Sequence, residues 1–396
     1  MGEQKNLFLA IGLSIAIIVI FQFIFPQQAL ITNVDNENVE QTQQLTSIDE
    51  NQTSGSKKIQ KKSDIIALND RVLIKTPSLE GSINLKGAIL DDLILLKYKE
   101  SLNENSKNIN FFSPDGTSNP YYIELGWKTL SNESELDLPN LDTKWKSDNN
   151  LLGPNSPVTL EWRNNQNIIF KLHFSLDENY LFEIKQEIIN NSNKKIEIFP
   201  YRLIKRINTP DTINFFILHE GLISLLNDEL LEKKYSKLED DCSSNNNAKS
   251  LYCDQKASGG WLGFTDKYWM ATLIPDPDEN INVNYRYGNN GRDNYRVGYV
   301  GQVNEIEPND SYIYKGKIFA GAKVLKILNK YKKDYNISRF DDAIDWGWFS
   351  FLTKPIFYAI NWFYKKIGNF GLAIIGFTIL MRLVLFPLAQ ASFKSM

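Results

Sequence analysis

The chain has 396 residues, of which 42% are hydrophobic and 23% are charged, and its formal net charge is −3. Its mean hydropathy of −0.32 is that of a water-soluble chain and excludes a bundle built mainly of membrane spans. The small excess of acidic residues excludes a general electrostatic affinity for nucleic acid, so no nucleic-acid partner is expected. The strongly apolar stretches lie near the two ends of the chain.

The first apolar stretch runs from Leu7 to Phe25 and is followed by Pro26. It is close to the roughly 20 residues that a helix needs to cross a bilayer. A cleaved signal peptide would show a basic start, a shorter apolar core and a cleavage site of small residues. Here Lys5 is the only basic residue before the stretch, and Phe-Pro-Gln-Gln follows it. The sequence therefore predicts an uncleaved N-terminal transmembrane anchor over residues 1–31.

Residues 32–69 differ in composition from the stretches on either side. They are rich in Gln, Asn, Ser, Thr, Lys and Glu and contain few apolar residues. Such a segment cannot bury enough apolar surface to offset the entropy of folding. The sequence predicts a disordered polar linker here.

Alternation of apolar and polar residues is the dominant pattern from Arg71 to about Phe319, and it is typical of half-buried strands. The alternating apolar positions include Phe182, Ile184, Ile188, Ile281, Val283, Tyr285, Tyr287, Tyr295, Val297 and Tyr299. The polar residues between them include Glu183, Lys185, Glu187, Asn282, Asn284 and Arg286, and Asn289-Asn290-Gly291 reads as a turn. About 250 residues of this kind predict one large antiparallel β-sandwich.

A helix is expected after the strands, from about Ala322 to Tyr335. Its apolar residues would share one face of the helix, and they are Val324, Leu325, Leu328 and Tyr331. With this helix, the predicted extramembrane domain covers residues 70–335.

Cys242 and Cys253 lie in a polar loop within that domain. They could close a small disulfide loop in an oxidising compartment, and two free thiols are the alternative. A bridge requires Cα atoms within about 7 Å of each other. No metal site is expected, because neither His173 nor His219 is near the cysteines in sequence.

The stretch from Asp345 to Ile367 combines aromatic residues with lysines. The residues predicted to anchor it at a membrane surface are Trp346, Trp348, Lys354, Trp362, Lys365 and Lys366. Segments of this composition lie in the membrane interface with their rings at headgroup level. We therefore predict that residues 336–367 form an amphipathic interfacial helix, with packing of a helix on the sandwich as the alternative. Pro355 is expected to open or kink this helix.

The second apolar stretch, Gly371 to Leu388, contains a charged residue, Arg382. At about 1.5 Å per residue, Arg382 is roughly 16 Å from Gly371, near the middle of a bilayer. An arginine there costs at least about 2.5–3.5 kcal/mol on insertion scales, so it usually faces a bundle interior or a water-filled cavity. The alternative is that Arg382 extends only to a nearby interface.

The basic residues around the two spans do not decide which side of the membrane the middle region occupies. The polar stretch after the first span carries Asp35, Glu37 and Glu40 before any lysine, and this favours export of the middle region.

No catalytic motif is found in the sequence. There is no Gly-rich phosphate loop, no G-x-S-x-G, no H-E-x-x-H and no cysteine pair at zinc spacing. The motifs therefore support neither an enzyme nor a cofactor, and they leave an enzyme open.

The end of the chain resembles the first core transmembrane helix of the YidC membrane protein insertases. The residues that carry this resemblance are Ile367 to Ile375, Thr378, Arg382, Phe386-Pro387-Leu388 and Ser392 to Met396. Segments that resemble other parts of that family, in the same order, are Leu93 to Tyr98, Asn179 to Phe182, Asn190-Asn191-Ser192, Pro200-Tyr201, Gly259-Gly260-Trp261, Tyr268, Ile274-Pro275, Phe319 to Lys323, Asp345 to Phe349 and Lys354-Pro355. Ala322 stands where the family usually has proline.

The resemblance implies a multi-pass protein of the bacterial inner membrane, with both termini in the cytoplasm and a periplasmic β-supersandwich. It implies a non-catalytic insertase and chaperone for nascent integral membrane proteins, acting alone or with Sec translocon components and in contact with membrane lipids. Arg382, with Thr378, would lie in a hydrated groove that receives the polar parts of a substrate. No cofactor is needed, because burial of the substrate's apolar span drives insertion.

The family's groove is built from five core helices, whereas residues 368–396 supply only the first. We therefore expect a C-terminally truncated chain and assign the function to the complete protein. The alternative function is a membrane-anchored periplasmic sugar-binding or mutarotase-like domain. A cleft that holds a histidine against a carboxylate would favour that alternative.

Overall fold

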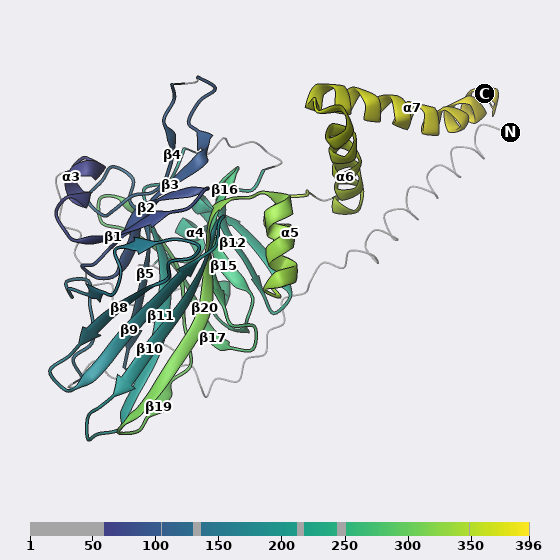
Figure 1. The fold of residues 1–396 in the computed structure, drawn as a ribbon. Coiled ribbons are helices and arrows are strands. Elements are labelled where there is room, and N and C mark those ends of the chain that lie inside the picture. The colour runs from purple at the N-terminus through teal and green to yellow at the C-terminus, as the bar shows by residue number, and fades with distance from the viewer. Residues whose placement is uncertain are drawn as a thin grey trace. The chain divides into compact units, whose positions relative to one another are not determined.

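The computed structural model describes residues 59–103, 105–129, 136–211, 218–243, 251–347 and 349–395. The predicted anchor over residues 1–31 lies outside these ranges. Within them, two β-sheets are followed by three helices (Figure 1), namely α5 (Leu325–Asp334), α6 (Ser350–Ile367) and α7 (Phe370–Ser395). The predicted class, a mainly β domain with helices at its C-terminal end, is confirmed.

The first sheet contains eleven strands. Its neighbouring strands are, in order, β14 (Asp254–Ser258), β17 (Asn280–Asn289), β18 (Asp293–Val300), β11 (Ile196–Ile207), β5 (Tyr121–Lys128), β3 (Ile89–Lys99), β2 (Leu79–Asn84), β1 (Arg71–Lys75) and β7 (Leu151–Leu152). In addition, β19 (Asn304–Ile306) pairs with β11, and β4 (Asn108–Phe112) pairs with β3. Pairing is antiparallel except between β1 and β7, which run parallel.

The second sheet contains nine strands and is antiparallel throughout. Its order is β13 (Glu229–Lys234), β12 (Gly221–Leu226), β15 (Trp261–Thr265), β16 (Trp269–Pro275), β20 (Asp310–Ala322), β10 (Leu181–Asn190), β9 (Ile168–Leu176), β8 (Val158–Arg163) and β6 (Lys146–Ser147). The shorter elements are α3 (Lys62–Ile66), α4 (Tyr235–Asp241) and the 3₁₀ turns η2 (Leu251–Cys253) and η3 (Phe340–Ala343).

The two sheets pack face to face, with their apolar residues between them. The rings of Trp127 on β5 and Phe170 on β9 lie edge to face, 5.1 Å apart. Polar contacts cross the core as well, because the Tyr285 hydroxyl on β17 donates to the Ser224 hydroxyl on β12 over 3.0 Å. A sandwich is therefore present, as the alternation predicted.

Strand β10 shows how the alternation specifies burial. Phe182, Ile184 and Ile188 are buried, whereas Lys185 between them is exposed. Successive side chains of a strand point to opposite faces, so this spacing sends the apolar residues into the core.

The polar face of β17 departs from the same pattern. Asn284 and Arg286 were expected to face solvent, but both are buried. The Arg286 guanidinium donates to the Cys253 carbonyl oxygen (3.2 Å) and to the Asp254 carboxylate (2.6 Å), and Asn284 donates to the same carboxylate. The prediction was wrong here because the segment around η2 covers this face of β17.

A disulfide between Cys242 and Cys253 holds that covering segment together, with Cα atoms 5.6 Å apart. Both cysteines are buried. The Tyr287 amide of β17 donates to the Cys242 carbonyl oxygen over 3.0 Å, so the bridged segment is bound directly to the strand.

Replacing both cysteines by serine is expected to loosen this segment without unfolding the sandwich. Closing a loop of this size stabilises a protein by about 2–4 kcal/mol in the chain-entropy view, and here the loss falls on the cover of β17. Amide hydrogen exchange should speed up at Tyr287, whereas Tyr299 on β18 should keep its protection. Unchanged exchange at Tyr287 would contradict the expectation.

A short helix, α3, lies within the predicted linker. The ammonium group of Lys62 contacts the Asn110 side-chain oxygen (2.5 Å), the Phe112 carbonyl oxygen (2.7 Å) and the Asp92 carboxylate (2.6 Å). These contacts with the sandwich order the segment although its composition alone does not favour folding. The predicted disorder of residues 32–69 is therefore wrong for residues 62–66.

The helices near the C-terminal end also start later than predicted. Strand β20 stays paired with β16 as far as Ala322, so α5 begins at Leu325 rather than at Ala322. Asn336 and Arg339 have left-handed backbone conformations, which interrupt an α-helix, and residues 336–347 contain no α-helix.

Pro355 is the sixth residue of α6 and lies inside the helix, so the expectation that it opens the helix was wrong. Its missing N–H group deprives only the Phe351 carbonyl of a helical donor. Such a loss is smaller near a helix end than in the middle.

Candidate functional site

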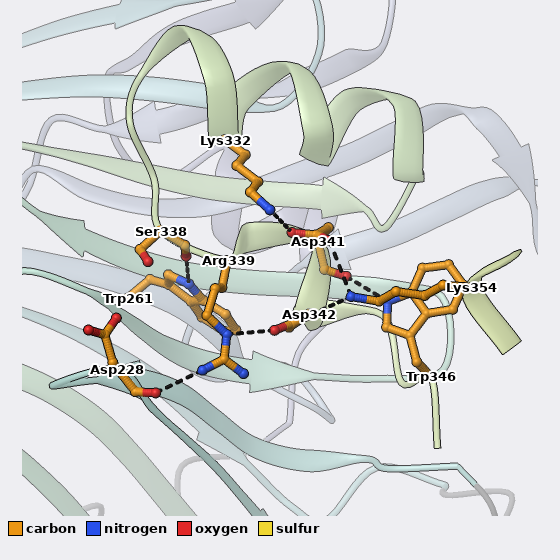
Figure 2. Close-up of polar contacts among 9 residues, drawn as sticks. All are labelled: Asp228, Trp261, Lys332, Ser338, Arg339, Asp341, Asp342, Trp346 and Lys354. Carbon is orange, nitrogen blue, oxygen red and sulfur yellow. Dashed lines mark hydrogen bonds and ion pairs between the residues drawn. The ribbon is translucent and has the colours of Figure 1, made fainter. Parts of the chain in front are cut away.

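The connection between the sandwich and α6 is a polar joint built on η3. Asp341 accepts hydrogen bonds from two lysine ammonium groups, that of Lys332 on α5 (2.8 Å) and that of Lys354 on α6 (3.4 Å). Asp342 accepts a further bond from Lys354 over 2.8 Å. Figure 2 shows Asp341 between Lys332 and Lys354, and Asp342 between Lys354 and Arg339. One turn of chain therefore ties α5 to α6.

The charges in this joint stabilise one another. Burial alone would raise the pKa of Asp341, but Lys332 and Lys354 outweigh it and hold that pKa below its usual range. Burial would likewise lower the pKa of Lys354, but Asp342 and Asp341 raise it. Both partners therefore stay ionised at neutral pH.

Two tryptophans and an arginine complete the joint (Figure 2). The indole N–H of Trp346 donates to the Asp341 carbonyl oxygen, and that of Trp261 on β15 donates to the Ser338 carbonyl oxygen, both over 3.0 Å. Arg339 donates to the Asp342 carboxylate and to the Asp228 carbonyl oxygen, each over 2.8 Å. Lys354 also lies over the Trp346 ring, 5.4 Å from its centre.

Neutralising Lys354 should loosen the first turn of α6. In Lys354→Gln we expect faster hydrogen exchange at Leu352 and Thr353, corresponding to about 1 kcal/mol, because a charged hydrogen bond to a half-buried carboxylate is lost. Lys365→Gln makes the same charge change on an exposed residue of α6 and should leave these two amides unchanged. Equal effects of the two variants would show that the joint does not hold the helix.

The predicted anchoring residues fall into different environments. Trp346 and Lys354 contact the protein in the joint, whereas Trp362, Lys365 and Lys366 are exposed on α6, and Trp348 lies outside the described residues. Helix α6 also exposes Phe349 at its N-cap and, along its length, Phe351, Leu352, Phe357, Tyr358 and Tyr364. Such aromatic exposure on a helix in water is unusual and suits the membrane interface.

Helix α7 is long and apolar enough to cross a bilayer. Its span runs from Phe370 to Pro387, with a mean hydropathy of 2.1, and little of it is buried. It packs on α6 through small residues, since Ala373 is buried and a side chain at Gly376 would meet the Phe363 ring.

Thr378 and Arg382 are both exposed and, being four residues apart, share one face of α7. The Thr378 hydroxyl donates to the Ile374 carbonyl oxygen over 2.8 Å. Within the described residues, no hydrogen bond or ion pair to Arg382 is found. The helix therefore presents one cation and one hydroxyl among apolar side chains.

Sequence reasoning missed a second polar cluster, where β20 ends. The ammonium group of Lys323 donates to the Thr265 hydroxyl over 2.8 Å, and burial lowers the pKa of Lys323 to about 8. The His219 amide donates to the Asp345 carboxylate over 3.0 Å, which links the segment before β12 to the segment before α6. Lys323 and Asp345 lie in segments that resemble the YidC family, but nothing in the sequence indicated that they contact Thr265 and His219.

A histidine–carboxylate pair does occur, but it lies on a sheet surface. His173 on β9 contacts Glu187 on β10 over 2.7 Å, and both side chains point away from the core among polar neighbours. A hollow of about 480 Å³ elsewhere is lined by neither histidine and by no carboxylate. No group of three or more metal-ligating side chains is found in the described part of the chain. These observations do not favour the sugar-binding alternative.

Comparison with known proteins identifies the sandwich. The family model of the YidC periplasmic domain matches residues 71–359. The "Membrane protein insertase YidC" of Rickettsia felis is 41% identical over 99% of this chain, and that of Rickettsia bellii is 42% identical over 82% of it. The chain spans 68% of the first relative's length and 57% of the second's. These relatives are named as insertases, in agreement with the prediction of a protein that is not an enzyme.

Among solved structures, a galactose mutarotase related enzyme from Lactobacillus acidophilus covers 63% of this chain with a TM-score of 0.42 and 8% identity. A putative aldose 1-epimerase from Escherichia coli covers 63% with a TM-score of 0.39 and 8% identity. Likenesses this distant carry no inference about activity. The family match and the apolar helix α7, in contrast, indicate a membrane protein with a periplasmic domain. The chain belongs to the YidC family of membrane protein insertases.

Proposed function

We propose that this protein helps nascent integral membrane proteins to insert and fold in the bacterial inner membrane. The observation that carries the proposal is the exposed Arg382 on the apolar helix α7, with Thr378 on the same face. A charge at this depth is retained at a cost of about 2.5–3.5 kcal/mol on insertion scales, which calls for a functional reason.

A hydrated groove that contains Arg382 would provide that reason. Polar and acidic parts of a substrate would be attracted to the guanidinium while the substrate's apolar segment moves into lipid. Attraction between opposite charges strengthens away from bulk water, so one cation is enough to draw acidic segments of the substrate into the groove. The substrate's apolar burial supplies the driving force.

Photo-cross-linking tests this proposal directly. The photoreactive residue replaces Thr378 in the protein as its host produces it. In inner-membrane vesicles it should cross-link to a ribosome-bound membrane protein. Leu380 is also exposed but lies about 200° around the helix from Thr378, so a probe there should give few adducts. Equal adducts at the two positions would contradict a groove on the Arg382 face.

Family membership also supports three finer proposals. The first is a multi-pass arrangement in which the predicted anchor and α7 both cross the membrane and the sandwich lies in the periplasm. The second is contact of α6 with membrane lipids through its exposed aromatic residues. The third is cooperation with Sec translocon components, which co-purification from cross-linked membranes would test.

A further inference from the structure

Helix α5 has a basic face directly opposite its buried face. Lys326, Lys330 and Lys333 are all exposed. At 100° per residue they fall within about 60° of one another, so they form one stripe, called here the α5 lysine stripe. The opposite face, with Leu325, Leu328 and Tyr331, is buried against the sandwich.

The stripe is not explained by contacts within the protein. The ten residues of α5 include four lysines and one aspartate. Lys332 pairs with Asp341, whereas no hydrogen bond or ion pair to the three stripe lysines is found in the part of the chain that the structure describes.

Helix stability does not explain the stripe either. Cations are favourable in the last turn of a helix, which accounts for Lys333, but unfavourable in the first turn, where Lys326 lies. The stability of α5 therefore does not account for the basic character of this face.

The joint places this stripe near α6. Asp341 binds Lys332 of α5 through one carboxylate oxygen and Lys354 of α6 through the other. Asp341 therefore bridges the last turn of α5 and the second turn of α6. The stripe extends about 10 Å along α5 from that point.

We propose that the α5 lysine stripe binds anionic phospholipid headgroups at the periplasmic surface of the membrane, and this rests on the proposed membrane position of α6 and α7. Lipid is the occupant that the structure favours, because the stripe is cationic and α5 is tied through Asp341 to α6, whose exposed aromatic residues suit the membrane interface. Aromatic insertion combined with a basic cluster gives the two signals that stable membrane contact requires. The stripe then fixes the tilt of the sandwich over the bilayer.

The experiment uses the whole chain in nanodiscs. A fluorophore is attached at Asn329→Cys, next to the stripe, after the disulfide has formed, since the chain has no cysteines besides Cys242 and Cys253. Contact is measured as quenching of the fluorophore by lipids that carry a quencher on the headgroup. The bilayer is either phosphatidylcholine alone or a mixture rich in phosphatidylglycerol. We expect stronger quenching in the anionic bilayer, weakening with added salt.

Lysine-to-glutamine changes at Lys326, Lys330 and Lys333 should lower the contact equilibrium about fivefold per lysine and remove its dependence on phosphatidylglycerol. The control changes Lys75 on β1, Lys144 just before β6 and Lys146 on β6 to glutamine. These lysines are also exposed, so the net charge of the protein changes by the same amount. This control should keep the wild-type response.

A second fluorophore at Trp362→Cys on α6 separates the two proposals. If the α6 probe is not quenched, the membrane position itself is wrong. If the α6 probe is quenched but the α5 probe ignores lipid charge, the lipid proposal is overturned. An effect of the stripe changes in cells, without any lipid dependence in nanodiscs, would also overturn it and point to an acidic protein segment as the occupant.

Discussion

Gln186→Leu is expected to lower the free energy of unfolding of the sandwich by about 3–5 kcal/mol. Gln186 on β10 and Arg202 on β11 are fully buried between the two sheets. Gln186 accepts a hydrogen bond from the Arg202 Nε (2.8 Å) and donates one to the Gly126 carbonyl oxygen of β5 (2.9 Å). Leucine would leave a buried guanidinium and a buried carbonyl without these partners.

The double variant Gln186→Leu/Arg202→Met should be more stable than Gln186→Leu alone. No carboxylate lies within ion-pair distance of Arg202 among the described residues, so its charge depends on neutral partners such as Gln186 and the face of the Tyr314 ring. Removing the charge together with its partner replaces an uncompensated buried ion by an apolar side chain, which is often neutral or stabilising.

Urea unfolding of the whole chain in detergent, followed by tryptophan fluorescence, measures both variants. Gln302→Leu makes the same substitution at an exposed residue and should change stability by less than about 0.5 kcal/mol. A double variant no more stable than Gln186→Leu would show that Arg202 is stabilised by something other than this network.

The sequence predicted the elements of this fold better than it predicted their contacts. Alternation places Phe182 and Ile184 in the core because side-chain direction follows directly from position in a strand. The same logic failed for Arg286, because a segment more than thirty residues before it covers that face of β17. Periodicity describes one strand at a time and carries no information about such covering segments.

The joint at η3 illustrates the same limit for the candidate site. Trp346 and Lys354 were predicted to lie at a membrane surface, because their segment is rich in aromatic residues and lysines. Their contacts with Asp341 could not be predicted from the sequence, because acidic residues are spread along the whole chain. No spacing rule pairs one aspartate with two lysines on separate helices. The charge of Arg382 within α7 could be predicted, because a single arginine in an apolar run is recognised from the sequence alone, without knowledge of tertiary contacts.

Arg382→Ala should reduce insertion of substrates with acidic translocated tails roughly tenfold or more, the effect of losing one charged hydrogen bond worth about 1.5–3 kcal/mol. Arg382→Lys should retain most activity, because it keeps a cation at the same depth, although its head is more strongly hydrated. Thr378→Val should have a smaller effect, since the Thr378 hydroxyl already donates to Ile374 within its own helix.

The deciding measurement is in-cell insertion of two substrates that differ only in the acidity of the tail, in wild type and in each variant. A role in attraction requires that Arg382→Ala harms the acidic substrate more than the neutral one. If Arg382 only extends toward an interface, alanine should be tolerated for both substrates, because it also makes α7 easier to insert by a few kcal/mol. Equal insertion of the acidic substrate by wild type and Arg382→Ala would remove Arg382 from the mechanism. An equal loss for both substrates would instead indicate that the arginine supports the helix, because a packing defect does not distinguish one tail from the other.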